Sequence, residues 1–472
     1  AEGSSACNLI PLPIYLKSPF YIQNLMVSIY GWKLAKERYS EVGRSFLEGL
    51  EISQWLSREE LLKKQEESFI ELAKQAVKTV PYYRRVAYEG GFDSSDICSI
   101  EDINRFPILK KEFIRERPLE FVSENYDSRK LLKIFTSGTT GTPLTVYCNR
   151  VVRSKHYAFY SRLRGWFNAA SMSKRATFFG RVIMSPDLNN PPFWRYDYFQ
   201  NNLLMSSYHL NNNSIFEYYK KLRDYGPEEI IGYPSSLYQF ARYVVSKKLD
   251  PINVKLVICT AEMLYGNQKL MIQRAFRAPV IDQYGCTEMA FFASNCEEDT
   301  MHSHPEHGIM EIENERGEIL PHGNGRLIVT GLINSVMPLI RYDIGDLIEL
   351  EPPGSTCKCG RCFPVISNIN GRSDDVIYRS DGTPVGRLDP VFKGGSGIVA
   401  SQIIQNEDSS IDIYINPDSN FNKKIEQDLL LEMKNRVGSD INVRICIKED
   451  LARGRGGKFK AVIGKYKPNQ MT

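Results

Sequence analysis

The sequence predicts an α/β fold with two domains, a large amino-terminal domain of mixed sheets and helices and a small α+β domain at the carboxyl end. From about residue 130 to 345, short β-rich runs such as VKLVICT alternate with helical stretches such as SIFEYYKKLRDY. Such alternation is typical of α/β proteins. After GRSDD, at 371–375, the runs SIDIYI, KKIEQDLLLEMKNRV and NVRICI form a β-α-β pattern. We therefore expect one domain over residues 1–371 and a second over residues 372–472.

Size and composition narrow the class of protein. A chain of 472 residues is too long for one ordinary domain, and its 42% hydrophobic and 25% charged residues fit a globular protein with a sizeable core. The 60 basic and 56 acidic residues leave a formal charge of only +4, so the whole chain does not read as a nucleic-acid or membrane-surface binder. No apolar run is long enough to span a membrane and no signal-peptide pattern is found, so we expect a cytoplasmic protein.

Two segments near the amino end have readable patterns. Residues 11–34 are the most apolar and aromatic part of this end, but proline and lysine interrupt them. Packing on the main body is therefore favoured over contact with a membrane or a partner. Further on, Ser57 and Glu60 have the spacing of a capping box, apolar residues follow at helical intervals, and Pro81 comes after them. This pattern predicts a helix that begins after Ser57 and ends before Pro81.

The stretch TSGTTGTP, at 136–143, follows the strand-like LLKIF and is rich in hydroxyls and glycine. Such a loop offers backbone N–H groups and hydroxyls with little steric bulk, which suits phosphate oxygens. It lacks the GxxxxGK[ST] pattern of a P-loop, and a Ser/Thr/Gly loop by itself is more often an ordinary turn. The loop is a candidate for phosphate binding that needs support from elsewhere in the chain.

Three further stretches give that support. YGCTE ends in Glu288, RYDIGD ends in Asp346, and RGRGGKFK contains Lys458. Taken singly, these residues are explained as a helix cap, a turn cap and a solvated cation. In this order and at these separations, the four stretches resemble the core motifs of the adenylate-forming superfamily of acyl-CoA synthetases and related ligases. The resemblance spans about residues 60–465.

Within that superfamily, the chain resembles the phenylacetate-CoA ligase group and its CapK-type branch of capsular polysaccharide biosynthesis proteins. VPYYRR, TSGTTGTPL, GYPSSL, GRSDDVIY and GRLDPVFKG carry this likeness. The resemblance implies that the first domain is an adenylation domain and that the second is a small mobile lid. The lid would rotate about a hinge at Asp374.

The resemblance also implies a role for each matching residue. The catalytic residues would be Thr287, Glu288, which helps to hold Mg²⁺, and Lys458, which reaches the carboxylate and the α-phosphate. The loop at 136–141 would hold the β- and γ-phosphates of ATP, and Asp346 the ribose hydroxyls. The full set of expected nucleotide-binding residues is Thr136, Ser137, Gly138, Thr139, Thr140, Gly141, Ala261, Glu262, Tyr284, Gly285, Asp346 and Arg372.

Elementary chemistry agrees with this division of roles. A carboxylate that attacks the α-phosphorus of ATP brings two anions together, so positioning and charge neutralisation by Mg²⁺, Lys458 and backbone dipoles would dominate catalysis. The carboxylate is already ionised at neutral pH, so no general base is needed. A nucleic-acid role for the basic run around Lys458 is the weaker hypothesis, because no aromatic platform accompanies it.

Cysteine and histidine gather in NCEEDTMHSH, at 295–304, and in TCKCGRC, at 356–362. Thiolates with imidazole suit a tetrahedral Zn²⁺, and four protein ligands would make the site structural, within an insertion of about residues 296–362. By resemblance to relatives with such a pattern, the expected ligands are Cys296, His302, Cys357 and Cys359. Cys362, His304 and His307 are the substitutes, and reduced unligated thiols or a zinc-ribbon nucleic-acid module are the alternatives.

The acyl pocket is expected near GYPSS, ICTAE and YGCTE. Its expected lining consists of Tyr233, Pro234, Ile258 and Phe179, of which Phe179 is equally explained as core, while Cys286 is expected to pack rather than to act as a nucleophile. The sequence after GRSDD differs from that of the phenylacetate enzymes, so the acyl acceptor is left open among coenzyme A, an amine and a hydroxyl, for example of a sugar.

The leading hypothesis is an ATP-dependent, AMP-forming ligase that activates a carboxylic acid as an acyl-adenylate and transfers the acyl group. Its partners would be small molecules, without nucleic acid and without a membrane span, and a homodimer is compatible with it. The second hypothesis is a non-catalytic zinc-containing protein that binds nucleotide and acts in polysaccharide assembly. Pyrophosphate release that depends on an added acid separates the two.

Overall fold

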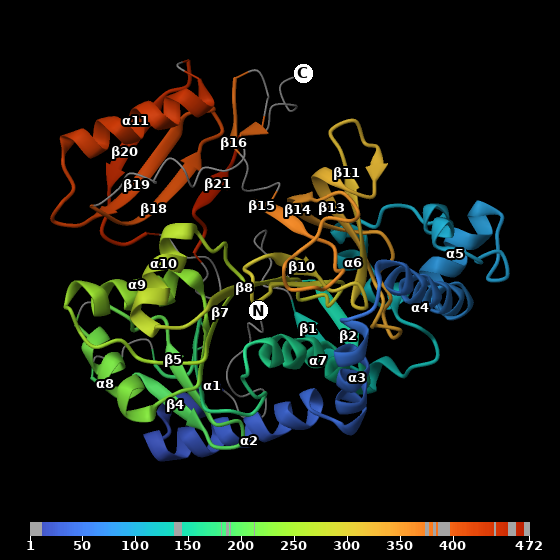
Figure 1. Ribbon diagram of the computed structural model, residues 1–472, viewed down its shortest axis with the longest axis horizontal. Helices are drawn as coiled ribbons and strands as arrows, with labels where there is room; N and C mark the ends of the chain where they lie inside the picture. The colour runs from blue at the N-terminus through green and yellow to red at the C-terminus, as the bar shows by residue number, and fades with distance from the viewer. Residues whose placement is uncertain are drawn as a thin grey trace.

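The chain is organised around an eight-stranded, a five-stranded and a four-stranded sheet, with helices on their faces (Figure 1). In this computed structural model the described residues are 12–135, 144–180, 182–185, 188, 190–211, 213–372, 377–380, 384–385, 397–438, 440–451 and 459–466. The expected α/β class is confirmed. The α-helices are α1 (Leu12–Lys17), α2 (Phe20–Arg38), α3 (Glu41–Ser53), α4 (Arg58–Thr79), α5 (Pro81–Gly90), α6 (Lys111–Glu116), α7 (Arg150–Trp166), α8 (Ile215–Tyr225), α9 (Pro234–Ser246), α10 (Gly266–Phe276) and α11 (Lys423–Val437).

The eight-stranded sheet has a parallel centre and antiparallel edges. In spatial order its strands are β10 (Met301–Ser303), β9 (Phe292–Asn295), β8 (Val280–Gly285), β7 (Leu256–Thr260), β6 (Glu229–Gly232), β3 (Arg175–Phe179), β5 (Asn202–Ser206) and β4 (Trp194–Asp197). The five strands from β8 to β5 run parallel to one another. The loops that follow parallel strands meet at one edge of the sheet, so this edge is where sites are usually built.

Alternate residues of a central strand face two different cores. In β7, Val257 and Cys259 pack in the core formed with α8, α9 and α10, whereas Leu256 and Ile258 pack in the core formed with α3 and α7. A strand that is apolar on both faces is the pattern of a covered parallel sheet. The predicted strand VKLVICT and the predicted helices in SIFEYYKKLRDY and SSLYQFARYVVSKK are thus confirmed as β7, α8 and α9.

A five-stranded antiparallel sheet and a short hairpin complete the first part of the chain. The sheet consists of β12 (Ile319–Leu320), β11 (Gly308–Glu313), β13 (Gly323–Gly331), β14 (Tyr342–Leu350) and β15 (Ile366–Arg372), and the hairpin of β1 (Leu132–Phe135) and β2 (Thr145–Cys148). Ile134 and Val146 of the hairpin share a core with Val329, Tyr342 and Met289. This packing ties the hairpin to both sheets.

The helix predicted after Ser57 is α4. The Ser57 hydroxyl accepts from the Glu60 backbone N–H, and the Glu60 carboxylate accepts from the Ser57 N–H, so both halves of the capping box are present. The helix ends at Thr79, before Pro81, and Pro81 then opens α5. Proline is well accommodated there because the first helical N–H has no partner within the helix.

The tail has its own sheet and its own core. Its strands are β20 (Val443–Ile447), β19 (Ile411–Pro417), β18 (Ile398–Gln405) and β21 (Val462–Gly464), and the short pair β16 (Ile377–Tyr378) and β17 (Pro384–Val385) precedes them. The predicted β-α-β pattern is β19-α11-β20, with β19 and β20 parallel. Ile403, Ile413, Leu429 and Met433 form a core separate from those of the large sheets. Strands β18 and β21 were not predicted.

Candidate active site and metal centre

Four neighbouring parallel strands deliver the expected pocket and nucleotide residues to one edge of the large sheet. Phe179 ends β3, Tyr233 follows β6, Ala261 and Glu262 follow β7, and Tyr284 lies near the end of β8. The rings of Phe179 and Tyr233 are 5.3 Å apart in an edge-to-face contact. Motifs that are far apart in the sequence thereby become neighbours at the carboxyl edge.

The expected lining of the acyl pocket differs in exposure from residue to residue. Ile258 is fully buried in the core with Ile231 and Ile281, and Pro234 is the buried first residue of α9. Phe179 is partly buried and packs against that same core. The lining role of these residues stays a prediction.

Glu262 joins this edge to the tail. Its Oε2 accepts from the Ser235 N–H at 3.1 Å, and its Oε1 accepts from the Phe459 N–H at 2.7 Å. Ser235 lies in the first turn of α9, where backbone N–H groups are free to bind an anion. Ala261 has the left-handed backbone that positions the turn, with φ of 68°.

Phe459 directly follows Lys458 in the sequence, and Lys458 itself lies outside the described residues. The backbone N–H of Phe459 is the group that reaches Glu262. The sequence offered no signal for this pairing, because the two residues are 197 positions apart.

The two residues expected at the ribose lie opposite each other. Asp346 in β14 and Arg372 in β15 are paired in register, and the Tyr284 hydroxyl donates to Oδ2 of Asp346 at 2.8 Å. Tyr284 belongs to the eight-stranded sheet and Asp346 to the five-stranded one. The hydrogen bond therefore links the two sheets at the expected nucleotide site. Gly285, the last residue of β8, directly follows Tyr284.

Glu288 is held by a tyrosine that the sequence analysis missed. The Tyr342 hydroxyl donates to Oε1 of Glu288 at 2.7 Å, and both residues are buried. Burial raises the pKa of Tyr342 well above its usual value, so the hydroxyl keeps its proton. Tyr342 is part of the RYDIGD stretch, so its place in that motif was the available signal. Thr287 is partly buried beside Glu288.

The thiol of Cys286 is in the same neighbourhood. Burial, followed by the charge of Glu288, raises the pKa of Cys286 to about 12. A thiol with so high a pKa is a poor nucleophile at neutral pH. Cys286 packs against the core around Tyr342, as expected for a packing role.

The expected phosphate loop can be located only by its ends. Residues 136–141, like Asp374 of the expected hinge, lie outside the described residues. The loop connects β1 to β2, whose nearest paired residues are Phe135 and Thr145. Ile134 and Val146 of this hairpin share a core with Met289, which follows Glu288 in the chain. The two strands that flank the loop therefore belong to the same core as the neighbour of the residue expected to hold Mg²⁺.

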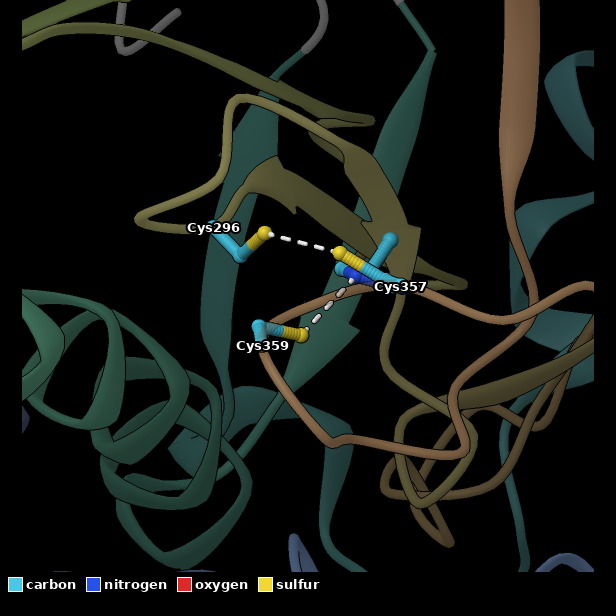
Figure 2. A group of neighbouring side chains, drawn as sticks. Cys296, Cys357 and Cys359 are labelled. Atoms are coloured by element: carbon cyan, nitrogen blue, oxygen red, sulfur yellow. Dashed lines mark hydrogen bonds between the residues drawn. The ribbon is translucent and has the colours of Figure 1, made fainter.

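The four expected zinc ligands form one group. Cys296 follows β9, His302 lies in β10, and Cys357 and Cys359 lie between β14 and β15. One ligand atom from each residue lies within 4.8 Å of all the others. Figure 2 shows the sulfur atoms of the three cysteines turned toward one another, with Cys296 Sγ 3.6 Å from Cys357 Sγ. The Sγ of Cys359 is 3.4 Å from Nε2 of His302.

Groups around the cluster orient it. Nδ1 of His302 is 3.3 Å from the Phe363 carbonyl oxygen, which leaves Nε2 to face the thiols. Burial raises the pKa of Cys296 to about 12, and a bound cation would favour the thiolate form of this residue. Arg361 adds support, since it forms two hydrogen bonds of 2.7 and 2.9 Å with the Glu297 carboxylate.

The three substitutes lie apart from this group. Cys362 is exposed. Nδ1 of His304 is 2.7 Å from a guanidinium nitrogen of Arg162, and Nε2 of His307 is 3.0 Å from Nδ1 of His156. Both histidines are therefore engaged in a buried polar network, and only Cys296, His302, Cys357 and Cys359 make up the metal-binding group among the described residues.

The chain is similar to several known proteins. Residues 377–465 match the family model of the CapK C-terminal domain. The chain is 29% identical to protein CapK of Staphylococcus aureus, covering 96% of this chain and 99% of that protein. It is 24% identical to the phenylacetate-coenzyme A ligase of Thermus thermophilus, covering 86% of this chain and 97% of that protein.

The chain resembles protein CapK and the phenylacetate-coenzyme A ligases. Its fold agrees with this, because a 2-hydroxyisobutyryl-CoA ligase, solved in the postadenylation state with R3-HIB-AMP, superimposes with a TM-score of 0.69 at 18% identity, over 88% of this chain and 91% of that one. The predicted resemblance to the adenylate-forming superfamily and its CapK-type branch is confirmed. The comparisons support an AMP-forming acid ligase, and the carboxyl edge of this ligase-like chain is its candidate active site.

Proposed function

We propose that the protein is an ATP-dependent ligase that activates a carboxylic acid as an acyl-adenylate and then transfers the acyl group to an acceptor. The observation that carries the proposal is that Glu262 follows β7 and Tyr284 lies near the end of β8 at the carboxyl edge, with Phe459 of the tail donating to Glu262. Tyr284 also donates to Asp346 of the five-stranded sheet. Groups from both large sheets and from the tail therefore support the positioning of a nucleotide and an acid.

The protein's own groups would act mainly by positioning. Asp346, held by the Tyr284 hydroxyl, would accept hydrogen bonds from the ribose, and Glu262 would orient the tail through the Phe459 N–H. Lys458 would bring a positive charge to the carboxylate and the α-phosphate. In the step itself a carboxylate oxygen forms a bond to the α-phosphorus, the bond from that phosphorus to the bridging oxygen breaks, and pyrophosphate leaves.

Mg²⁺ fits the buried carboxylate of Glu288. One of its oxygens accepts from Tyr342, which leaves the other oxygen available to a cation or to water bound to it. The ion would neutralise phosphate charge. Tyr342 would keep the carboxylate in one orientation and would exclude water from its buried side, because Tyr342 is itself fully buried.

The acyl acceptor is proposed from the names of the relatives. Phenylacetate-coenzyme A ligase and 2-hydroxyisobutyryl-CoA ligase both name coenzyme A, and coenzyme A is therefore the first acceptor to test. An amine or a hydroxyl is the second, because the sequence after GRSDD departs from the phenylacetate enzymes. A role in polysaccharide assembly is proposed from the CapK-type resemblance of the sequence motifs.

We also propose that Cys296, His302, Cys357 and Cys359 hold a structural Zn²⁺. Three thiolates and one imidazole fill a tetrahedral shell and leave no position for water. The ion would join the β9–β10 turn to the loop before β15. It would therefore stabilise the region in which the two large sheets meet.

The test is release of pyrophosphate from ATP in the presence of aryl, acyl, amino and sugar acids, each with and without coenzyme A. Acid-dependent release is expected, and absence of release with every acid tested would leave a non-catalytic nucleotide-binding role. Lys458→Ala should lower the rate by at least about a hundredfold while ATP binding persists. An unchanged rate in this variant would remove Lys458 from the proposal.

A further inference from the structure

Helix α2 buries three polar side chains against β4 and its flank. These are Gln23, Asn24 and Ser28, and Gln23 Oε1 accepts from Nε of Arg195 in β4 at 2.6 Å. Asn24 Oδ1 accepts from the Tyr196 N–H at 3.0 Å, and Ser28 Oγ accepts from the Tyr198 N–H at 3.0 Å. Strand β4 is at the edge of the eight-stranded sheet, so its outward backbone groups need such partners. The expected packing of residues 12–34 on the main body is confirmed for this face of α2.

Four large apolar side chains of α2 lie on its outer face, whereas Val27 and Leu34 are buried. Tyr21 is 81% exposed, Leu25 58%, Ile29 46% and Trp32 43%. Their spacing of four, four and three residues places them on one face of the helix. Phe199, from the turn between β4 and β5, lies beside this face with its ring centroid 6.4 Å from that of Trp32. In Figure 1 α2 runs along the outer rim of the molecule.

The charged residues of α1 and α2 up to residue 36 are all positive. The sequence from residue 12 to residue 36 contains Lys17, Lys33 and Lys36 and no aspartate or glutamate. Glu37, the first acid after them, is buried. Nζ of Lys36 lies 3.8 Å from the centroid of the Trp32 ring, so an aromatic ring and a cation are presented together.

We propose that the outer face of α2, together with α1, docks on an anionic membrane surface. A helix with exposed aromatic and aliphatic residues on one face, flanked only by lysines, has the composition of a helix that lies in the headgroup region. Lysine near an anionic bilayer adds attraction that a neutral bilayer lacks. The docking is parallel to the surface, since no described helix is long and apolar enough to cross a membrane.

The same charges argue against a second copy as the occupant. A twofold contact through this face would bring the lysines of one chain against those of the other, with no acid from residues 12–36 to compensate. An anionic lipid surface supplies the missing negative charge. The α2 surface therefore requires a negatively charged partner, which a second copy of the same face does not provide.

The experiment is co-sedimentation of the full chain with vesicles of phosphatidylcholine alone and of phosphatidylcholine with phosphatidylglycerol at about 7:3. Binding to the anionic vesicles, weakened by added salt, is expected. Leu25→Ser with Ile29→Ser should lower the partition coefficient by about tenfold or more. Lys17→Ser with Lys36→Ser should lower it several-fold on anionic vesicles only.

A matched control uses equally exposed apolar residues elsewhere. Leu270 in α10 and Leu431 in α11 are 60% and 61% exposed, and Leu270→Ser with Leu431→Ser should leave vesicle binding unchanged. All of the substituted side chains are on the surface, so the melting temperatures should stay close to that of the parent chain. Absence of binding by the parent chain, or equal loss in the control, would overturn the proposal. A dimer that only Leu25→Ser with Ile29→Ser dissociates, without vesicle binding, would also overturn it.

Discussion

The hydroxyl of Tyr342 is the donor that fixes one oxygen of Glu288, at 2.7 Å. Tyr342→Phe removes this donor without emptying the site. Because the remaining carboxylate loses its orientation, we expect acid-dependent pyrophosphate release to fall by about tenfold, with a higher Mg²⁺ concentration needed for half the maximal rate. The Mg²⁺ dependence is the measurement that a merely destabilised protein would not change.

Tyr225 provides the matched control for that substitution. Its hydroxyl donates to the Asn201 carbonyl oxygen at 2.7 Å, just before β5 and hence at the opposite edge of the sheet. Tyr225→Phe should leave the rate and the Mg²⁺ dependence alone. Equal effects of the two substitutions would contradict the role given to Tyr342.

At the scale of elements, the loop between β14 and β15 contains one cysteine that is a predicted metal ligand and one that is not. Cys359 belongs to the four-residue metal group, whereas Cys362, three residues later, is exposed and outside it. Cys359→Ser should reduce bound zinc from about one equivalent to nearly none, and the melting temperature should fall by several degrees. Cys362→Ser should change neither the bound zinc nor the melting temperature. Zinc measured in the purified proteins and thermal melts with and without chelator are the readouts, and zinc retained by Cys359→Ser would refute the ligand assignment.

Local patterns predicted some elements well and others not at all. The capping box and the following proline were sufficient for α4, and the four metal ligands implied by the resemblance form one group in the structure. The roles that the resemblance implies for Glu288 and Asp346 stay predictions. Strand β21 has only three residues and pairs with β18, far away in the chain, so its formation depends on tertiary contacts. The bond between Glu262 and the tail is equally non-local. The burial of Gln23, Asn24 and Ser28 in α2 depends on the position of this helix beside a sheet edge. The sequence of residues 20–38 does not encode that position by itself.

At the scale of the whole molecule, the tail is also held by an ion pair. Arg242 of α9 and Asp418, just after β19, are 3.1 Å apart and partly exposed. Arg242→Asp or Asp418→Arg alone should slow pyrophosphate release by a few-fold, because each places like charges across the contact. The double substitution should recover much of the rate, and a double-mutant cycle on the rates measures the coupling. No recovery would mean that this contact does not help to close the tail.

Acid sensitivity is expected from the buried histidines. Burial lowers the pKa of His307 to about 3 and the pKa of His156 well below its usual value. In the unfolded chain both histidines have a pKa of about 6.5. The free energy of unfolding that they contribute above that pH is therefore lost as the pH falls toward 3. Each pH unit in that window costs at most about 1.4 kcal/mol per histidine. Urea unfolding at several pH values should show this slope, and His307→Gln should flatten it; an unchanged slope would contradict the assignment.

Asn24 and Ser28 act as the outermost rung of the eight-stranded sheet, although they belong to a helix, because they accept from the Tyr196 and Tyr198 N–H groups. Cutting the chain after residue 38 would therefore take the partners of these two N–H groups away from the edge at β4. An unpaired edge strand is a template for strands of neighbouring molecules. The shortened chain is expected to assemble edge to edge into insoluble fibrils, even though every residue of the candidate active site would still be present.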